Sequence, residues 1–214
     1  MSYYGNEYER RTLMNIEALY FQKYFYFKHL NQSSSEHRVT YWVKLSRDIE
    51  LHRLMYALLD VVQNQPVLRT QFVTDDFNQL KINLRDFFPF IEIKEVNEMS
   101  QSIDLEAFFT RNLNSYHFNQ LPLFNFKIYQ FLDEAYLLLD FHATIFNESQ
   151  LIPFLQQLNI AYTHSLKSEY SISDFYNWIK EMNQKMDQNQ VVCPSNHFNV
   201  LNADGDNYAY IPVK

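Results

Sequence analysis

The stretch EAYLLLDFHATIFNESQ, residues 134–150, decides how the rest of the chain is arranged. Residues 135–145 predict a β-strand, because the apolar side chains Leu137, Leu139 and Phe141 alternate onto one face. A turn at residues 146–149 follows, and Asn147 with Gln150 is typical of a capping box at a helix start. A side chain at such a strand end can project into a cleft, so we expect any active site here.

His142 lies on the other face of that strand, together with Asp140. We expect this face to be less completely sealed than the apolar one. Two interpretations of His142 stay open: a general base acting on an amine or hydroxyl, and a structural histidine hydrogen-bonded to the backbone or to Asp140. Same-face neighbours in one strand are about 6.6 Å apart, so a direct Asp140–His142 dyad is not implied.

Composition excludes several classes of function. The 214 residues carry a net charge of -7, which disfavours nucleic-acid binding. No apolar run reaches the ~18 residues of a membrane span, and the N-terminus lacks the apolar segment of a signal peptide. We therefore expect a cytoplasmic protein without a membrane partner. The single cysteine, Cys193, can form neither an internal disulfide nor a thiolate metal site alone.

The body of the chain holds no glycine, because Gly5 and Gly205 are the only two. Phosphate-cradling loops need glycine for close backbone approach, so a P-loop or a dinucleotide-binding turn is excluded. No histidine pair has the helical spacing of a metal site. We expect the remaining histidines to lie at the surface: His29, His37, His52, His117, His164 and His197.

Hydrophobic periodicity predicts an α+β fold with a mixed β-sheet packed by helices on one side. Helices are expected over residues 12–30, from an Asp48 cap to Pro66, from Ser102 or Asp104, after Asn147, and from Ser171 or Ser173. Strands are expected over residues 39–45, 67–73, 79–84, 91–96, 123–131 and 135–145, the last two as a hairpin. The aromatic residues of 12–30 are interpreted as core packing. One domain, 1–186, is expected to precede a tail or linker, 187–214.

Three segments, in this order, resemble the N-terminal half of a nonribosomal peptide synthetase condensation domain. They are LMNIEALYF at residues 13–21, LRTQF at residues 68–72 and the opening stretch, which is similar to the family's HHxxxDGxS motif. The segment YSISDFYNWIKEM, residues 170–182, also resembles a family helix. The resemblance implies a single chloramphenicol acetyltransferase-like lobe over roughly residues 12–182.

The resemblance also implies roles for individual residues. His142 matches the motif's second histidine, which faces the acceptor amine and donor thioester, and Ser149 is also retained. Phe141, Phe146 and Asn147 stand where the family has histidine, aspartate and glycine.

In the family the motif aspartate is the structural partner of the arginine that Arg69 matches. With Phe146 in its place, Arg69 must find another partner or turn to solvent, because a buried unpaired arginine costs several kcal/mol. We expect Glu148 to be that partner.

Two functions follow from the resemblance, since a complete domain of this family has two lobes and about twice the length. The first, which we favour, is a truncated, non-catalytic lobe at the N-terminus of a synthetase, packing against a neighbour such as the adenylation domain. The second is the N-lobe of an active acyltransferase that joins carrier-bound thioesters, with His142 as base. No cofactor is expected in this domain, and an active one would use phosphopantetheine on a partner peptidyl carrier domain. A homodimer through the exposed lobe face is a further option.

Overall fold

The computed structural model describes residues 16–31, 37–77, 79–118, 120–164 and 172–187. Within them the helices are α1 Tyr20–Asn31, α2 Leu51–Asn64, α3 Leu105–Arg111, α4 Leu151–Thr163 and α5 Ile172–Asp187. The strands are β1 Ile16–Glu17, β2 Arg38–Lys44, β3 Thr70–Thr74, β4 Leu80–Leu84, β5 Glu92–Glu95, β6 Phe124–Gln130 and β7 Ala135–His142. The proposed tail after Asp187 lies outside the described residues, as do His197 and Ser171.

The strands form two sheets, one of four strands in the order β2-β7-β6-β5 and one of three in the order β1-β4-β3. The predicted hairpin is confirmed as the antiparallel β6–β7 pair, and β5 joins β6 in parallel, so the larger sheet is mixed as expected. Strand β7 lies inside this sheet, paired on both sides, and is buried from Tyr136 to His142. Residues 135–142 of the stretch 134–150 therefore form an inner strand of the larger sheet.

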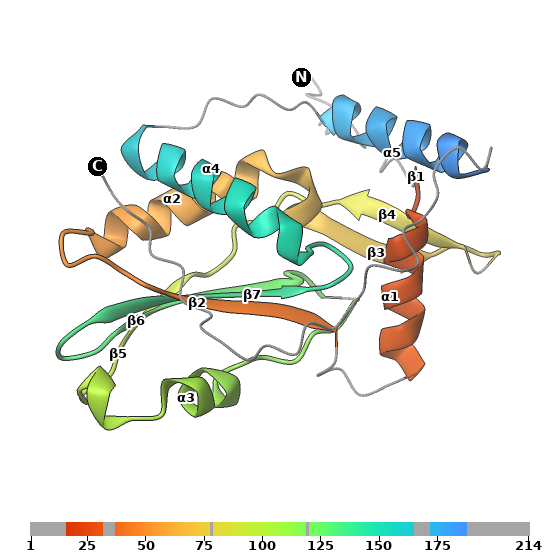
Figure 1. Cartoon of the computed structure of the whole chain (residues 1–214). Helices are drawn as coiled ribbons and strands as arrows, with labels where there is room; N and C mark the ends of the chain where they lie inside the picture. The colour runs from red at the N-terminus through yellow and green to blue at the C-terminus, as the bar shows by residue number, and fades with distance from the viewer. Residues whose placement is uncertain (1–15, 32–36, 78, 119, 165–171, 188–214) are drawn as a thin grey trace, which may run out of the picture.

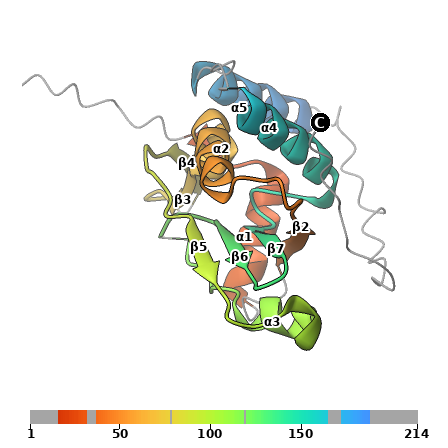
Figure 2. The ribbon, with the colours of Figure 1, turned by 90° about the vertical axis from the view of Figure 1, so that its left-hand side faces the viewer.

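Helices cover both faces of the larger sheet (Figure 1). Helices α2 and α4 lie over one face, whereas α3 lies against the other, as the turned view in Figure 2 also shows. Phe109 of α3 packs in a separate apolar cluster with Tyr136 and Leu138 of β7. The prediction of helices on one side is wrong, because the second face of β7 carries enough apolar surface to bury a helix of its own.

The hydrophobic pattern of the sequence predicted α2 better than any other element. Leu54, Leu58 and Val62 of the predicted stripe are buried in the main core, as expected. The helix begins later than predicted, since Glu50 rather than Asp48 is the residue before its first turn. At α3 the expected Asp104 cap is confirmed, because its carboxylate accepts a hydrogen bond from the Ala107 N–H at 3.1 Å.

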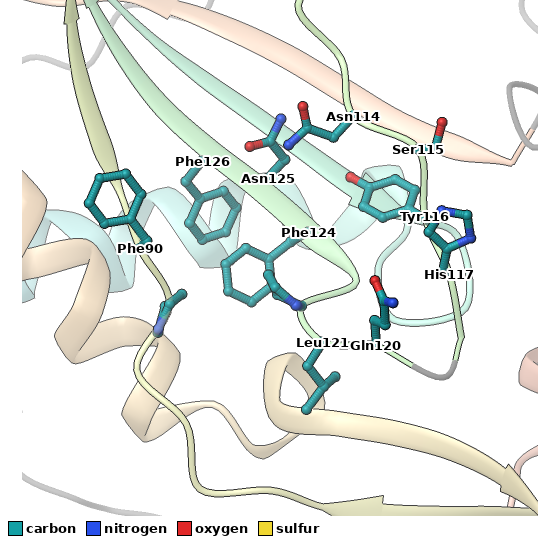
Figure 3. Close-up of a pocket in the computed structure, with 12 residues that line it drawn as sticks. Phe90, Asn114, Ser115, Tyr116, His117, Gln120, Leu121, Phe124, Asn125 and Phe126 are labelled. Carbon is teal, nitrogen blue, oxygen red and sulfur yellow. The ribbon is translucent and has the colours of Figure 1, made fainter.

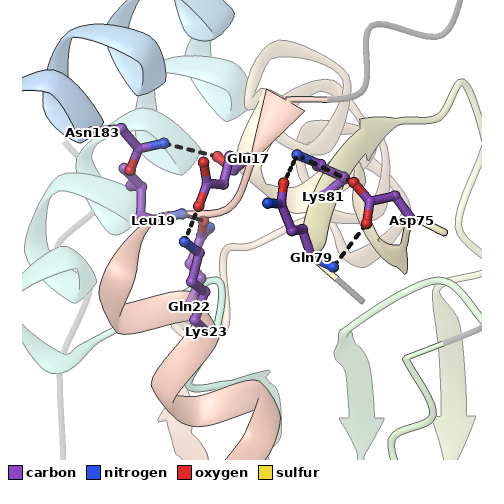
Figure 4. Close-up of polar contacts among 8 residues, drawn as sticks. All are labelled: Glu17, Leu19, Gln22, Lys23, Asp75, Gln79, Lys81 and Asn183. Carbon is purple, nitrogen blue, oxygen red and sulfur yellow. Dashed lines mark hydrogen bonds and ion pairs between the residues drawn. The ribbon is translucent and has the colours of Figure 1, made fainter. Parts of the chain in front are cut away.

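Short local structures shift several other predicted boundaries. A 3₁₀ turn at Pro66–Arg69 delays β3, so Arg69 lies before that strand rather than in it. The predicted turn between β3 and β4 is confirmed, since the Asp75 carboxylate accepts the backbone N–H group of Phe77. It also accepts that of Gln79, as Figure 4 shows. Strand β7 ends at His142, three residues earlier than expected.

The start of α1 corrects the prediction of one helix over residues 12–30. Ile16 and Glu17 instead pair with Ile82 and Lys81 of β4, and α1 begins only at Tyr20. Figure 4 shows what fixes this junction: the Leu19 N–H donates to Gln22 Oε1 at 3.0 Å, and Asn183 Nδ2 of α5 donates to the Glu17 carbonyl at 3.0 Å. Residues 12–15 lie outside the described part of the chain.

Helix α1 also differs from prediction in what it buries. Five of its large apolar side chains expose 40–61% of their surface: Tyr20, Phe21, Tyr24, Phe27 and Leu30. The interpretation of the aromatic residues as core packing is therefore wrong for these side chains, whereas Tyr26 does pack against the main core, with its ring centre 4.5 Å from that of Phe118. None of the helices within the described ranges has the length and apolarity needed to span a bilayer.

Candidate functional site

The turn after β7 is held by its own side chains. The Asn147 N–H donates to Gln150 Oε1 at 2.8 Å, as the capping box predicts, and the Ser149 hydroxyl donates to Asn147 Oδ1 at 2.6 Å. The chain then enters α4, where Pro153 lies in the first turn and needs no N–H partner there. The local sequence thus fixes the geometry of the strand end without a glycine at Asn147.

His142 is completely buried at this strand end. Its Nδ1 accepts the backbone N–H of Thr144 at 3.1 Å and lies 2.9 Å from the Thr144 hydroxyl, while its Nε2 lies 3.1 Å from Nδ1 of His29. Because Nδ1 accepts the Thr144 N–H, the ring proton lies on Nε2, which donates it to His29. Neither nitrogen of this tautomer offers a free lone pair to a substrate.

The electrostatic surroundings keep this imidazole neutral. Burial, and then the neighbouring His29, His37 and Arg38, lower the pKa of His142 to about 3. Burial, followed by the neighbouring His37, also lowers the pKa of His29. The pair therefore acts as a neutral hydrogen-bonded unit at ordinary pH.

Aromatic side chains close the space around His142. The rings of Phe118 and His29 lie 4.8 and 4.9 Å from its ring, centre to centre, and Tyr116 lies at 5.6 Å. A pocket of about 280 Å³ lies outside this layer, lined by Tyr26, His29, Leu30, Tyr116, His117 and Phe118 and not by His142. The expectation of a less sealed face is wrong, because the 116–118 loop and α1 cover it.

Two of the histidines expected at the surface are part of this layer. His29 is half-buried and touches His142, and His37 is 2% exposed. His52, His117 and His164 are exposed, as predicted. Among the described residues no group of three or more histidine, cysteine or carboxylate side chains could hold a metal ion.

Asp140 forms polar contacts with a different set of side chains from those around His142. Its carboxylate accepts hydrogen bonds from the hydroxyls of Thr40 at 2.7 Å and Tyr116 at 2.6 Å, with Arg38 Nε at 3.6 Å. Burial raises the pKa of Asp140, although these three neighbours each act to lower it, and burial likewise raises the pKa of Tyr116 well above its usual value. The carboxylate ties the 112–118 loop to the sheet, and no hydrogen bond joins it to His142.

The positions that resemble a catalytic motif now carry an aromatic stack. The rings of Phe141 and Phe146 are parallel within 5°, with centres 3.8 Å apart, and the ring of Phe154 from α4 is nearly perpendicular to both. Phe146 is 4% exposed. The turn is therefore anchored by apolar packing at the two positions for which the sequence resemblance implies a histidine and an aspartate in the family.

Arg69 has found a partner other than the predicted one. Its Nη1 lies 2.8 Å from Oδ1 of Asp86, while the guanidinium itself is largely buried. Glu148 is exposed, and Asp86 takes the place that we expected it to fill, so the Glu148 prediction is wrong. Asp86 follows β4 and meets Arg69 from the neighbouring strand end, a tertiary contact that no local pattern contains.

Comparison with known proteins places these features in context. The condensation-domain family model matches residues 16–195. No curated protein matches. The fold is similar to the starter condensation domain of the rhizomide synthetase RzmA (13% identity, TM-score 0.67, covering 81% of this chain and 45% of that chain). It is also similar to the first condensation domain of the CDA synthetase (9% identity, TM-score 0.67, 80% and 46%) and to the X-domain from teicoplanin biosynthesis (15% identity, TM-score 0.65, 84% and 41%). The chain spans less than half the length of the solved structures that it matches.

Proposed function

Because this chain belongs to the condensation-domain family, we propose that it is a non-catalytic lobe of a nonribosomal peptide synthetase that packs against another domain of that synthetase. The state of His142 carries the proposal. A general base must present a lone pair within reach of the proton it removes. Here the imidazole is fully buried, and both of its nitrogens are engaged by Thr144 and His29.

The residues around His142 support the same function. Phe141 and Phe146 stack where the family has ionisable side chains, so the turn is stabilised by packing rather than by an ion pair. Arg69, whose family counterpart pairs with the motif aspartate, pairs with Asp86 instead. These are the substitutions expected of a lobe that keeps the fold of the family but has lost its catalytic side chains.

The surface of α1 supports a packing role. Five large apolar side chains on one helix stay 40–61% exposed, and a large exposed apolar patch is typical of a surface that binds another protein. The partner that we favour is the adenylation domain of the same synthetase, with its peptidyl carrier domain as the next choice. The complex would act in the cytoplasm.

A second candidate is the N-lobe of a working condensation acyltransferase. It is favoured by the retention of His142 at the strand end, next to a pocket whose wall includes His29. In that case His29 and the 116–118 loop would move aside, and His142 would act as base on thioesters carried by the phosphopantetheine of a carrier domain.

Substitution in the intact synthetase separates the two functions. We expect His142→Ala and His29→Ala to leave peptide formation unchanged when both are assayed well below their unfolding temperatures. The matched pair matters because each variant breaks the same hydrogen bond, whereas only His142 matches the motif. A loss of about 100-fold or more in His142→Ala alone, with circular dichroism unchanged, would establish catalysis and overturn our proposal.

A further inference from the structure

A second pocket lies along β6, and His142 does not line it (Figure 3). Pro89 and Phe90 form one wall of this cavity of about 260 Å³, and residues 114–117 and 120–122 form the other. The three consecutive residues 124–126 line it as well. Because neighbouring side chains of a strand point to opposite faces of the sheet, a pocket that touches all three lies at the edge of the strand rather than over one face.

The hydrogen bonds of β6 show which of its backbone groups point to that edge. The Leu123 carbonyl accepts the His142 N–H at 2.8 Å, so the odd-numbered residues of β6 bond to β7. The even-numbered residues face the opposite way, where the Gln130 carbonyl accepts the Val96 N–H at 2.8 Å. Residues 124 and 126 therefore direct their N–H and C=O groups toward the pocket.

Phe124 and Phe126 present backbone rather than side chain there. Their rings are 3% and 2% exposed and pack in the main core. Strand β5 pairs only with residues 127–130, so it leaves the first part of β6 uncovered. Within the described ranges, no backbone hydrogen bond reaches the two N–H groups or the Phe124 carbonyl. A row of unpaired groups along a strand is a template for a further strand.

The lining of the pocket favours an uncharged, extended segment. None of the lining residues is Asp, Glu, Lys or Arg, so an ionised side chain would lose its hydration without gaining a partner. Phe90 is 89% exposed and offers its ring to an apolar neighbour. An α-helix, about 10 Å across, is too wide for this cavity, whereas an added strand lies only about 4.8 Å from its neighbour.

Residues 207–213, NYAYIPV, match this description and lie outside the described part of the chain. They carry no charge, and Tyr, Ile and Val, which are enriched in strands, make up most of the segment. Residues 1–15, by contrast, include four charged side chains: Glu7, Glu9, Arg10 and Arg11. Residues 188–206 span up to about 60 Å when extended, farther than the diameter of roughly 40 Å of a compact domain of this size, so the segment can reach the pocket from the end of α5.

Pro212 indicates how this segment would be oriented. Proline has no N–H, and in sheets it lies in edge strands with its nitrogen turned to solvent. Since the N–H groups of a strand alternate in direction, those of Ala209 and Ile211 then face the neighbouring strand. An edge position beside β6 therefore suits this sequence better than a position between two strands.

We propose that residues 207–213 bind in this pocket as an added strand beside residues 124–126 of β6. The Ala209 N–H donates to the Phe124 carbonyl, the Phe126 N–H donates to a carbonyl of the segment, and the segment packs against Phe90. Because the segment belongs to the same chain, its effective concentration at the pocket is high. This contact is separate from the strand-end turn and does not depend on whether the lobe is catalytic.

Two pairs of variants isolate the hydrogen bond and the aromatic contact. Ala209→Pro removes the N–H, whereas Ala209→Val keeps it and has as many side-chain carbon atoms as proline. Phe90 and Phe88 are 89% and 82% exposed, so replacing either with serine leaves the core untouched. Only Phe90 lines the pocket, which makes Phe88→Ser the control.

The test is amide hydrogen exchange in the ¹⁵N-labelled 214-residue chain, followed by NMR. We expect slow exchange of the Phe124 and Phe126 amides in the unmodified chain. Ala209→Pro should speed it by about tenfold, and Ala209→Val by less than about twofold. Phe90→Ser should shift the resonances of residues 207–213, and Phe88→Ser should not.

Three results would overturn the proposal. The first is exchange of the Phe124 and Phe126 amides at the rate of an unstructured peptide in the unmodified chain, which would leave the edge open to solvent. The second is equal exchange in the two Ala209 variants. The third is a nuclear Overhauser effect between residues 207–213 of one chain and β6 of another in a mixture of ¹³C- and ¹⁵N-labelled chains, which would assign the edge to a second copy. None of these results bears on the proposed function, because no variant touches His142 or α1.

Discussion

The neutral imidazole of His142 makes the stability of the fold depend on pH. Its folded-state pKa is lowered to about 3, whereas a histidine in an unfolded chain takes up a proton near pH 6.5. Below pH 6.5 the unfolded state therefore binds more protons, and stability falls as the pH falls. We predict that this side chain alone lowers the free energy of unfolding by about 1 kcal/mol between pH 6.5 and 5.5, and by up to about 1.4 kcal/mol for each further pH unit towards pH 4.

Urea denaturation at several pH values measures this effect, and His142→Phe is the control because it cannot titrate. The variant should retain only the smaller slope contributed by other groups, including His29, whose pKa is lowered in the same direction. Equal slopes in the two proteins would show that His142 is protonated in the folded state, and hence that it is less sealed than described.

Placing an aspartate at position 146, as the resemblance to the family motif implies, should damage the fold. Phe146 stacks on Phe141 and is 4% exposed, and Arg69 is already paired with Asp86. Phe146→Asp would lose a buried ring and bury a charge without a partner, so we predict a loss of about 3–5 kcal/mol in unfolding free energy. Phe88→Asp, at an exposed ring, should cost less than about 0.5 kcal/mol. A stable Phe146→Asp protein would mean that Arg69 had exchanged partners.

The sequence predicted the contacts of the site that join neighbouring residues, and it did not predict those that join distant segments. The turn at residues 147–150 could be predicted, because its capping interaction joins two residues that are three positions apart. His29 and Tyr116 were not, because they reach His142 and Asp140 from other segments, and a periodic pattern records faces rather than partners. For the same reason Asp86 was missed as the partner of Arg69, whereas the position of His142 near the end of a strand was predicted from the local pattern.

At the scale of elements, the Tyr116–Asp140 hydrogen bond joins the 112–118 loop to the centre of the sheet. It is buried at both ends and shares its carboxylate with Thr40. Tyr116→Phe keeps the ring but leaves Asp140 with one donor fewer, so we predict a loss of about 1–3 kcal/mol in unfolding free energy. Chemical denaturation monitored by tryptophan fluorescence checks this, with Tyr162→Phe as the control because its hydroxyl contact is exposed. An equally small effect of both variants would mean that water replaces the lost donor.

Helices and strands that a pattern within one segment specifies were predicted accurately, and those that depend on contacts with distant segments were not. Helix α2 and the β6–β7 hairpin were predicted because one stripe or one short turn specifies each of them. Helix α1 was placed too early because Ile16 fits a helical stripe as well as a strand, and its pairing with Ile82 is a tertiary contact. Helix α3 was predicted, but its place on the second face of the sheet was not, because the polar Asp140 and His142 masked the apolar Tyr136 and Leu138 on that face.

For the molecule as a whole, α1 is the helix whose large apolar side chains the fold leaves most exposed to solvent. Its apolar side chains surround the helix rather than forming one buried stripe, and Gln22 is its one fully buried residue. It contains lysines but no acidic residue, although the chain carries a net charge of -7. A surface that is apolar and locally basic fits a partner that offers apolar side chains with carboxylates at their margin.

Binding to the adenylation domain of the same synthetase tests this surface. We predict that Tyr24→Ser and Phe27→Ser, at side chains 52% and 46% exposed, each weaken the complex by about tenfold or more, measured by isothermal titration calorimetry. Tyr56→Ser is the matched control, because Tyr56 is 65% exposed on α2 and should change the affinity by less than about twofold. If the α1 variants instead abolish self-association in sedimentation experiments and leave adenylation-domain binding intact, the surface is a homodimer interface. Since a serine at an exposed helix position removes ring surface without opening a core cavity, either outcome reports on the interface rather than on folding.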